Sequence, residues 1–141
     1  MNVDSLFWKV VNGDLPLPNA AALLGWKFIK HDKHKNKAYI EFDAPTSLTN
    51  PMGNIQGGML SAMLDDCMGP AVYATLPANK IAMTIEAKTQ FFRTASPGRI
   101  IGWGRVDYAT SRICFTSGQL TNESHEVLAT ATAIYQILNL R

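Results

Sequence analysis

The feature that most constrains this chain is the segment from Asn50 to Gly69, NPMGNIQGGMLSAMLDDCMG, where a loop leads into a nearly continuous apolar run. The run follows the glycine pair Gly57-Gly58 and has almost no polar face before Asp65. A helix that is apolar nearly all round is a buried helix. The rest of the chain must therefore cover this helix on all sides.

Two adjacent carboxylates, Asp65 and Asp66, stand on this expected buried helix. Burying an ionised group without a partner is costly, so their presence needs a reason. Asp65 lies seven residues after Gly58, close to two helical turns, and so shares the face of the amides that open the helix. Asp66 is rotated by about 100° and faces elsewhere. We expect Asp65 to be functional. We expect the Asp66 side chain to bond a structural neighbour or to take part in a subunit contact.

The start of the helix has the properties of an oxyanion hole. The first amides of a helix have no internal acceptor, and the helix dipole adds positive potential there. Gly57 and Gly58 carry no side chains, so a substrate carbonyl could approach their amides closely. A carboxylate such as Asp65 near these amides suits a general base acting on water, or a nucleophile acting on a carbonyl.

Two neutral amides, Asn50 and Gln56, precede the glycines and could hold that water or the carbonyl without titrating. A structural role for Asp65, as a cap or a bond to a neighbouring loop, is equally compatible with the residues alone. The local pattern therefore leaves the catalytic and structural interpretations open.

The composition excludes several functional classes. The chain has 141 residues, enough for one domain over 1–141, and a net charge of +2. Its most basic run, Lys30 to Lys37, has no interleaved aromatic residues, which favours a solvated hairpin tip over a nucleic-acid site. We expect no nucleic-acid partner.

The cysteines and the N-terminus indicate a compartment. Cys67 and Cys114 are too few for a disulfide framework, and no Cys/His spacing resembles a zinc site. The N-terminus lacks the pattern of a signal peptide, and no apolar run has the roughly 18–20 residues needed to span a bilayer. We expect a cytoplasmic protein without a metal or a membrane partner.

The hydrophobic pattern predicts an α+β architecture. A helix is expected over about 2–11, where Val3, Leu6, Phe7, Val10 and Val11 are helically spaced, and an extended connector over Asp14–Pro18. The central helix should run from Gly57 to about Thr75, with a kink or local irregularity at Gly69-Pro70. Strands are expected at Trp26–Ile29, Ala38–Phe42, 81–92, 100–108, 112–120 and 127–138.

Short turns between these strands favour antiparallel pairing. Five or six antiparallel strands would then form a sheet that wraps around the one long helix.

The residues that carry these features also resemble a known family. Asn50, then Gln56-Gly57-Gly58, then Asp65, at these spacings and followed by Met68-Gly69-Pro-Ala, resemble the signature of hotdog-fold acyl-CoA thioesterases. The resemblance is to the phenylacetate-pathway thioesterase-like group of the 4-hydroxybenzoyl-CoA thioesterase superfamily. It continues through the segments 83–98, 105–112 and 129–135, and covers about residues 36–138.

The resemblance implies a curved antiparallel sheet around a central helix, paired in a homodimer whose two sheets become continuous. Sites in the family lie at that dimer interface, and members also form homotetramers. Carried over by position, Asp65 would be the catalytic carboxylate, and the Gly58 amide with Gly57 would polarise the thioester carbonyl. Asn50 would position water or the carbonyl, and Thr84 would reach the composite site from the partner subunit.

The chain departs from the family at one position. Most relatives have histidine where this chain has Gln56, which can hydrogen-bond a carbonyl or the thioester sulfur but cannot take up a proton near neutral pH. Acid–base work would then depend on Asp65 alone.

The substrate implied is an acyl-CoA, with an aryl or a medium- to long-chain acyl group. No separate cofactor is implied, because coenzyme A enters as part of the substrate. The candidates for its phosphates are basic residues of the later strands, each of which could equally be a solvated strand residue: Lys88, Arg93, Arg99 and Arg112. We therefore expect an acyl-CoA thioesterase, with a non-catalytic acyl-CoA or lipid-binding protein on the same scaffold as the alternative.

Overall fold

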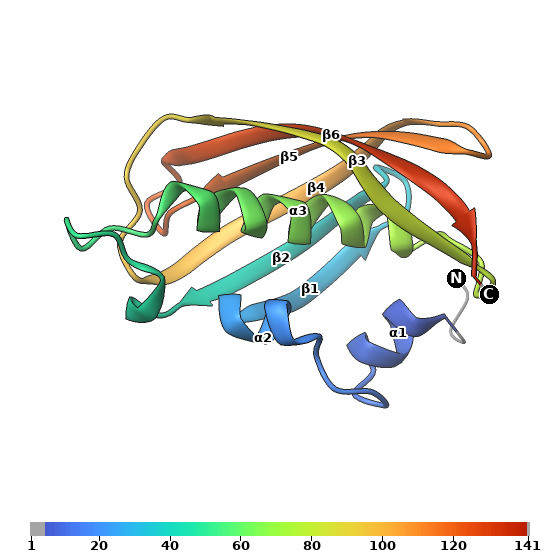
Figure 1. Ribbon diagram of the computed structural model, residues 1–141, viewed down its shortest axis with the longest axis horizontal. Helices are drawn as coiled ribbons and strands as arrows, with labels where there is room; N and C mark the ends of the chain where they lie inside the picture. The colour runs from blue at the N-terminus through green and yellow to red at the C-terminus, as the bar shows by residue number, and fades with distance from the viewer. Residues whose placement is uncertain (1–4, 141) are drawn as a thin grey trace.

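The computed structural model describes residues 5–140, which form a six-stranded antiparallel sheet around one long helix (Figure 1). The helical segments are α1 (Leu6–Val11), α2 (Asn19–Leu24), the 3-10 turn η1 (Thr46–Leu48) and α3 (Gly57–Tyr73). The strands are β1 (Trp26–Asp32), β2 (Lys37–Ala44), β3 (Lys80–Phe91), β4 (Gly98–Ala109), β5 (Ile113–Thr121) and β6 (Val127–Asn139). The α+β class and the hotdog fold expected from the sequence are confirmed.

The strands lie in the order β1-β2-β4-β5-β6-β3, and every neighbouring pair is antiparallel. After α3 the chain returns as β3 and pairs only with β6. The sheet therefore has two edges, β1 and β3. Figure 1 shows α3 crossing the inner face of the curved sheet, with α1 and α2 on the β1 side.

The contact between α3 and β4 is very close, and two glycines make it possible. A Cβ atom on Gly104 would lie 2.1 Å from the backbone oxygen of Cys67, and one on Gly102 would lie 2.5 Å from the Cys67 sulfur. Larger residues there would push the helix off the sheet. Around this contact the side chains of Phe42, Met63 and Leu64 are completely buried. The core thus lies between α3 and the concave face of the sheet.

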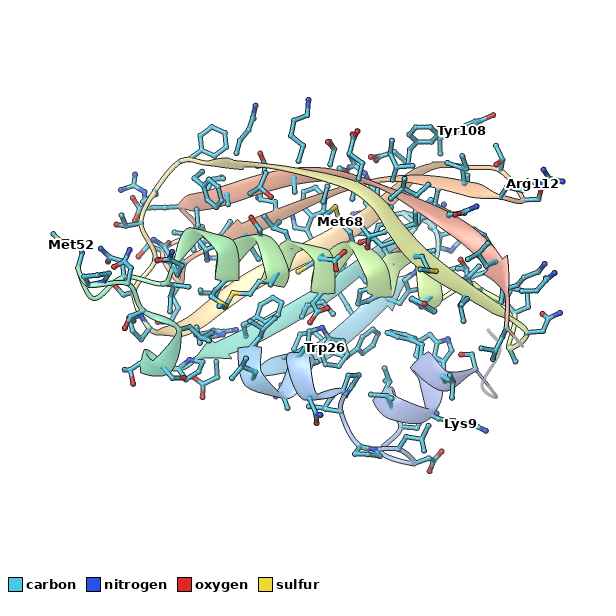
Figure 2. All side chains as sticks on the ribbon, in the orientation of Figure 1. Lys9, Trp26, Met52, Met68, Tyr108 and Arg112 are labelled. Carbon is cyan, nitrogen blue, oxygen red and sulfur yellow. The ribbon has the colours of Figure 1, made fainter. Side chains whose placement is uncertain are left out.

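The helix α3 continues through Pro70 to Tyr73. At Gly69-Pro70, where a kink or local irregularity was expected, the helix is continuous but lacks one backbone hydrogen bond. Proline has no amide hydrogen, so the carbonyl of Asp66, four residues earlier, loses its usual donor. The indole Nε1–H of Trp26 on β1 donates to that carbonyl at 2.8 Å instead (Figure 2 labels Trp26 beside α3). A tertiary hydrogen bond therefore replaces the missing helical one.

The N-terminal segment is attached to the far end of α3. Ser5 caps α1, and its hydroxyl accepts the amide of Trp8 at 3.4 Å. The indole of the buried Trp8 donates to the Ala74 carbonyl at 3.1 Å. The connector Asp14–Pro18 is irregular and extended, as expected. Val3 and Asp4, which the sequence also assigned to this helix, lie outside the described residues.

The β1–β2 hairpin is longer than expected, since the strands reach Asp32 and Lys37. The Asp32 carboxylate accepts the amides of His34 at 3.0 Å and Lys35 at 3.3 Å, and Asn36 has a φ of 50°. These features tighten the turn to four residues, 33–36. The charged run from Lys30 to Lys37 forms the end of this hairpin, as its composition predicted.

No helix among residues 5–140 is both long and apolar enough to cross a membrane. Cys67 and Cys114 are both buried and free.

The replacement of the Pro70 amide by Trp26 gives a first prediction. Trp26→Phe removes the indole donor and leaves the Asp66 carbonyl unsatisfied, so the free energy of unfolding should fall by about 1–3 kcal/mol. In a Pro70→Ala background the new amide can donate to the same carbonyl. In that background the loss of unfolding free energy caused by Trp26→Phe should be smaller by about 1 kcal/mol. Urea unfolding of the wild type, the two single variants and the double variant measures this difference.

The double-mutant cycle serves as its own control, because the change in ring size is common to both backgrounds. Equal losses in the two backgrounds would mean that the indole does not substitute for the helical amide.

Candidate active site

Asp65, on α3, lies at the centre of a small hydrogen-bond cluster. The hydroxyl of Tyr135 donates to Asp65 Oδ1 at 2.5 Å, and the hydroxyl of Thr84 donates to the same oxygen at 3.1 Å. Among residues 5–140 nothing donates to Oδ2. One carboxylate oxygen is thus held by two hydroxyl groups, and the other is free to accept a proton from water or to approach a carbonyl.

The pairing of β3 with β6 brings the two hydroxyl groups together. Thr84 is directly opposite Tyr135 in this antiparallel ladder, so their side chains project on the same face. The register shifts immediately afterwards, between Thr84 and Glu86, which leaves Ile85 as an extra residue on β3. The bulge therefore lies next to the cluster, and regular pairing resumes at Glu86 and Ile134.

Tyr135 is a candidate site residue that was not predicted from the sequence. On β6, the alternate residues Ala131, Ala133 and Tyr135 are all buried. The alanines leave room for α3, and the longer tyrosine, 3% exposed, reaches Asp65. The sequence signal that could have indicated it is the alternation of Ala131, Ala133 and Tyr135, which predicts that the tyrosine faces the buried side of the strand.

The surroundings keep Tyr135 a hydrogen-bond donor. Burial, reinforced by the charge of Asp65, raises the pKa of the Tyr135 phenol well above its usual range. The phenol therefore keeps its proton at physiological pH and can stabilise a negative charge on Asp65 Oδ1.

Asp66 has a different environment from its neighbour. Its backbone carbonyl accepts the Trp26 indole, but no hydrogen bond to its carboxyl group is found among residues 5–140. Burial, with a smaller contribution from the charge of Asp65, raises the pKa of Asp66 to about 6. The expectation that its side chain bonds a structural partner finds no support within this chain.

The start of α3 offers free amides, as the sequence predicted. The amides of Gly57 and Gly58 have no acceptor among the described residues, whereas the next two amides both donate to the Gln56 carbonyl. Gln56 occupies the N-cap position, and its exposed side chain makes no capping bond. Asn50 Oδ1 accepts the amides of Met52 and Asn54 at 3.0 and 3.2 Å, and so holds the preceding loop.

These amides are far from Asp65 within one chain. Seven residues of α3 separate Gly58 from Asp65, a rise of roughly 10 Å along the helix. A single carbonyl group cannot contact both. One chain therefore holds two separate candidate groups, which we name the amide half-site (Asn50, Gln56, Gly57, Gly58) and the carboxylate half-site (Asp65, Thr84, Tyr135).

Thr84 belongs to the same group as Asp65, because its hydroxyl contacts the Asp65 carboxylate of its own chain. This contact forms because β3 follows α3 directly and runs back along it. The expected reach of Thr84 into the site of a partner subunit stays a prediction.

The four basic residues considered for coenzyme A do not form one cluster. Arg93 is paired with Glu126 at 3.0 Å, and Arg99 is paired with Glu41. These two arginines lie near the end of β3 and the start of β4, whereas Arg112 lies in the β4–β5 turn at the opposite end of the molecule (Figure 2). Lys88 and Arg112 have no ion-pair partner among residues 5–140.

A largely apolar cavity of about 380 Å³ adjoins the carboxylate half-site. Asp65, Asp66, Thr84 and Tyr135 form its polar wall. The remainder comes from α1, the connector before α2, α2, β1, the second half of α3 and the start of β3. The cavity could accommodate an apolar group attached to a carbonyl held beside Asp65.

Within residues 5–140 we find no group of three or more His, Cys, Asp or Glu side chains placed to hold a metal ion.

The chain is similar to known proteins in sequence and in fold. A model of the thioesterase superfamily matches residues 52–129, from the loop before α3 into β6. A phenylacetic acid degradation-related protein from Ralstonia eutropha JMP134 is 32% identical, with a TM-score of 0.88, and the match covers 92% of this chain and 98% of that protein.

More distant structures share the fold. The E. coli PaaI protein from the phenylacetic acid degradation operon has a TM-score of 0.80 at 15% identity, covering 94% of this chain and 93% of that one. A Bacillus halodurans protein solved with CoA has a TM-score of 0.68 at 19% identity, covering 71% of this chain and 66% of that one. A comparison with curated proteins gave no match.

The environment of Asp66 predicts a dependence of stability on pH. Its pKa of about 6 lies above the value of an unfolded aspartate, so the folded chain binds the extra proton between about pH 4 and 6. Stability must then fall as the pH rises through this range. At pH 8 Asp66→Asn should raise the free energy of unfolding by about 2–3 kcal/mol, and near pH 4 it should change it little.

Urea unfolding across this pH range measures the difference between variant and wild type. Asp43→Asn, at an exposed position on β2, is the matched control for the loss of one aspartate. A difference for Asp66→Asn that does not change with pH would contradict the raised pKa of Asp66.

Proposed function

The chain belongs to the thioesterase superfamily, and we propose that it hydrolyses acyl-CoA thioesters to a free acid and coenzyme A. The observation that carries this proposal is the state of Asp65. Its Oδ1 is fixed by the Tyr135 and Thr84 hydroxyl groups, its Oδ2 is free, and it lines an apolar cavity. A fixed carboxylate with one free oxygen can activate a water molecule against a carbonyl held beside it.

In the proposed reaction, Asp65 Oδ2 takes a proton from water as the water oxygen attacks the thioester carbon. Negative charge develops on the carbonyl oxygen, and the unpaired amide of Gly58, with that of Gly57, stabilises it. The tetrahedral intermediate then expels the thiolate of coenzyme A. The proton held by Asp65 returns to that sulfur, so the carboxylate is regenerated.

The reaction needs both half-sites, and we propose that they meet across a homodimer. Along one chain α3 and β3 run in opposite directions. A Cβ atom on Gly57 would lie 3.6 Å from the Phe91 ring, Ser61 bonds Thr89 at 3.1 Å, and Asp65 bonds Thr84. The amide half-site therefore lies near the end of β3, and the carboxylate half-site lies near its first half.

Antiparallel pairing of β3 with its copy would bring the two half-sites together. A pairing centred near Ala87 would set Thr84 of one chain opposite Gln90 of the other, so Asp65 would approach the helix start of the second copy. β3 is suited to this role because it is a sheet edge of 12 residues with exposed apolar side chains at Met83, Ile85 and Phe91. Such edges are normally covered.

Coenzyme A is the proposed carrier of the acyl group. The related fold from Bacillus halodurans was solved with CoA, which supports a CoA site on this scaffold. Lys88 and Arg112 are the better candidates for its phosphates, because Arg93 and Arg99 would first have to leave Glu126 and Glu41.

Gln56 favours a second function, binding of acyl-CoA without turnover. An amide at the helix start can hold a carbonyl but cannot move a proton. Thiol release across a panel of acyl-CoAs, run beside a binding measurement, separates the two functions. Binding without release of coenzyme A would favour the non-catalytic protein.

Asp65→Asn tests the catalytic assignment. The amide keeps the shape of the side chain and an oxygen for Tyr135 and Thr84, but it cannot accept a proton from water. We expect kcat/KM for the best acyl-CoA of the panel to fall at least about 100-fold, with folding unchanged by circular dichroism.

Asp65→Ala should lose activity to a similar extent, and Asp43→Asn should retain it. Hydrolysis at near the wild-type rate by Asp65→Asn would exclude Asp65 as the catalytic carboxylate.

Mixed dimers test the composite site. Gly58→Pro removes one amide donor at a helical position that tolerates proline and has open space beside it. Each variant alone should be inactive. Unfolding Asp65→Asn and Gly58→Pro together in urea and refolding the mixture should restore about one quarter of wild-type activity, because half of the dimers would contain one intact site.

The same mixture prepared without unfolding serves as the control for subunit exchange. No recovery after joint refolding, with dimers present by light scattering, would place both half-sites in a single chain.

A further inference from the structure

We propose that α1 limits the size of the acyl group, and that the cavity beside Asp65 admits an uncharged, largely apolar acyl group. This inference rests on the proposed function. Leu6, Phe7 and Val10 of α1 line the cavity, and α1 lies outside the segment 52–129 that the family model matches. Asp65, Thr84 and the Gly57-Gly58 amides lie within the matched segment, whereas α1 would set the choice of acyl group from outside it.

The direction of the cavity supports this assignment. Along α3 it is lined by Asp65, Asp66, Gly69, Pro70 and Tyr73, a rise of roughly 12 Å from first to last. The indole of Trp8 attaches α1 at Ala74, directly after this row. An acyl chain whose carbonyl lies beside Asp65 would therefore run along α3 toward α1.

The volume of the cavity is suited to an acyl group alone. At about 380 Å³ it lies near the lower end of the roughly 300–1,000 Å³ of small-molecule sites, so the much larger coenzyme A must remain outside. Apart from the carboxylate wall, its lining is mostly aliphatic and aromatic.

The charges around the cavity select against acidic acyl groups. Among the described residues that line it, Asp65 and Asp66 are the only ones with a carboxyl group, and none is Lys, Arg or His. An acyl group that ends in a second carboxylate would meet negative charge without a compensating cation. Neutral acyl groups avoid this penalty.

The wall formed by α1 is fixed in place. The Trp8 ring packs edge-on against Phe28 of β1, with ring centres 5.7 Å apart, and the Phe7 ring packs against the same Phe28 at 5.8 Å. Leu6 is not part of this packing core, since 54% of its surface is exposed. Leu6 can therefore be changed with little effect on folding.

The experiment changes the wall in both directions. Leu6→Ala should open the cavity and Val10→Phe should shorten it. Leu23→Ala is the matched control, because Leu23 on α2 is 55% exposed and does not line the cavity. Rates of thiol release are measured from butanoyl-CoA to hexadecanoyl-CoA, with adipoyl-CoA compared against hexanoyl-CoA.

We expect Val10→Phe to lower kcat/KM for the longest good substrate at least tenfold while short acyl groups are spared. Leu6→Ala should shift the optimum to longer chains, and Leu23→Ala should leave the profile unchanged. Adipoyl-CoA should be hydrolysed at least tenfold more slowly than hexanoyl-CoA. Profiles of Val10→Phe and Leu6→Ala that match the wild type would overturn the role of α1.

Binding of the corresponding S-alkyl-CoA thioethers, measured by calorimetry, separates this inference from the proposed function. These compounds cannot be hydrolysed. If no acyl-CoA is cleaved but thioether affinity follows the same order in the variants, the proposed function fails and the role of α1 stands. If thioesters are cleaved but neither rates nor affinities depend on α1, the proposed function stands and the role of α1 fails.

Discussion

The close contact between α3 and β4 is the constraint on which the rest of the structure depends. At Gly104 the strand has no room even for a methyl group against the Cys67 backbone, so the rotation of the helix about its own axis is fixed there. Once Cys67 faces β4, Asp65, two residues earlier, must face away from it toward β6 and β3. Asp66 then faces β1. The contact between Cys67 and Gly104 therefore places the two adjacent carboxylates in different environments, although it involves neither of them.

The difference between these environments separates what the two carboxylates can do. Asp65 meets two hydroxyl donors that hold one oxygen and stabilise its charge. Asp66 meets no donor within the described chain, and burial raises its pKa. The Asp65 carboxylate, fixed by hydrogen bonds and facing the cavity, is suited to accept a proton from water. The Asp66 carboxyl group, which no donor orients, is suited mainly to repel a second negative charge.

The sequence predicted the features that depend on local pattern. The apolar run after Gly57-Gly58 predicted the central helix, and alternation with short turns predicted the later strands. It did not predict Tyr135, because only the β3–β6 register sets Tyr135 opposite Thr84. Nor did it predict that Trp26 replaces the Pro70 amide, since that bond joins residues 40 positions apart. Long-range register and tertiary contacts leave no local signal in a single sequence.

The separation of the amide and carboxylate half-sites follows from helix geometry rather than from any special feature of this chain. Two groups on one helix face, two turns apart, cannot touch the same carbonyl group, however the side chains rotate. A two-fold axis beside the helix removes this limit, because it reverses the order of the two groups on the second copy. In the proposed homodimer, the exposed apolar edge of β3 and the amides of Gly57 and Gly58, unpaired among the described residues, would have one common explanation, since the partner subunit would cover both.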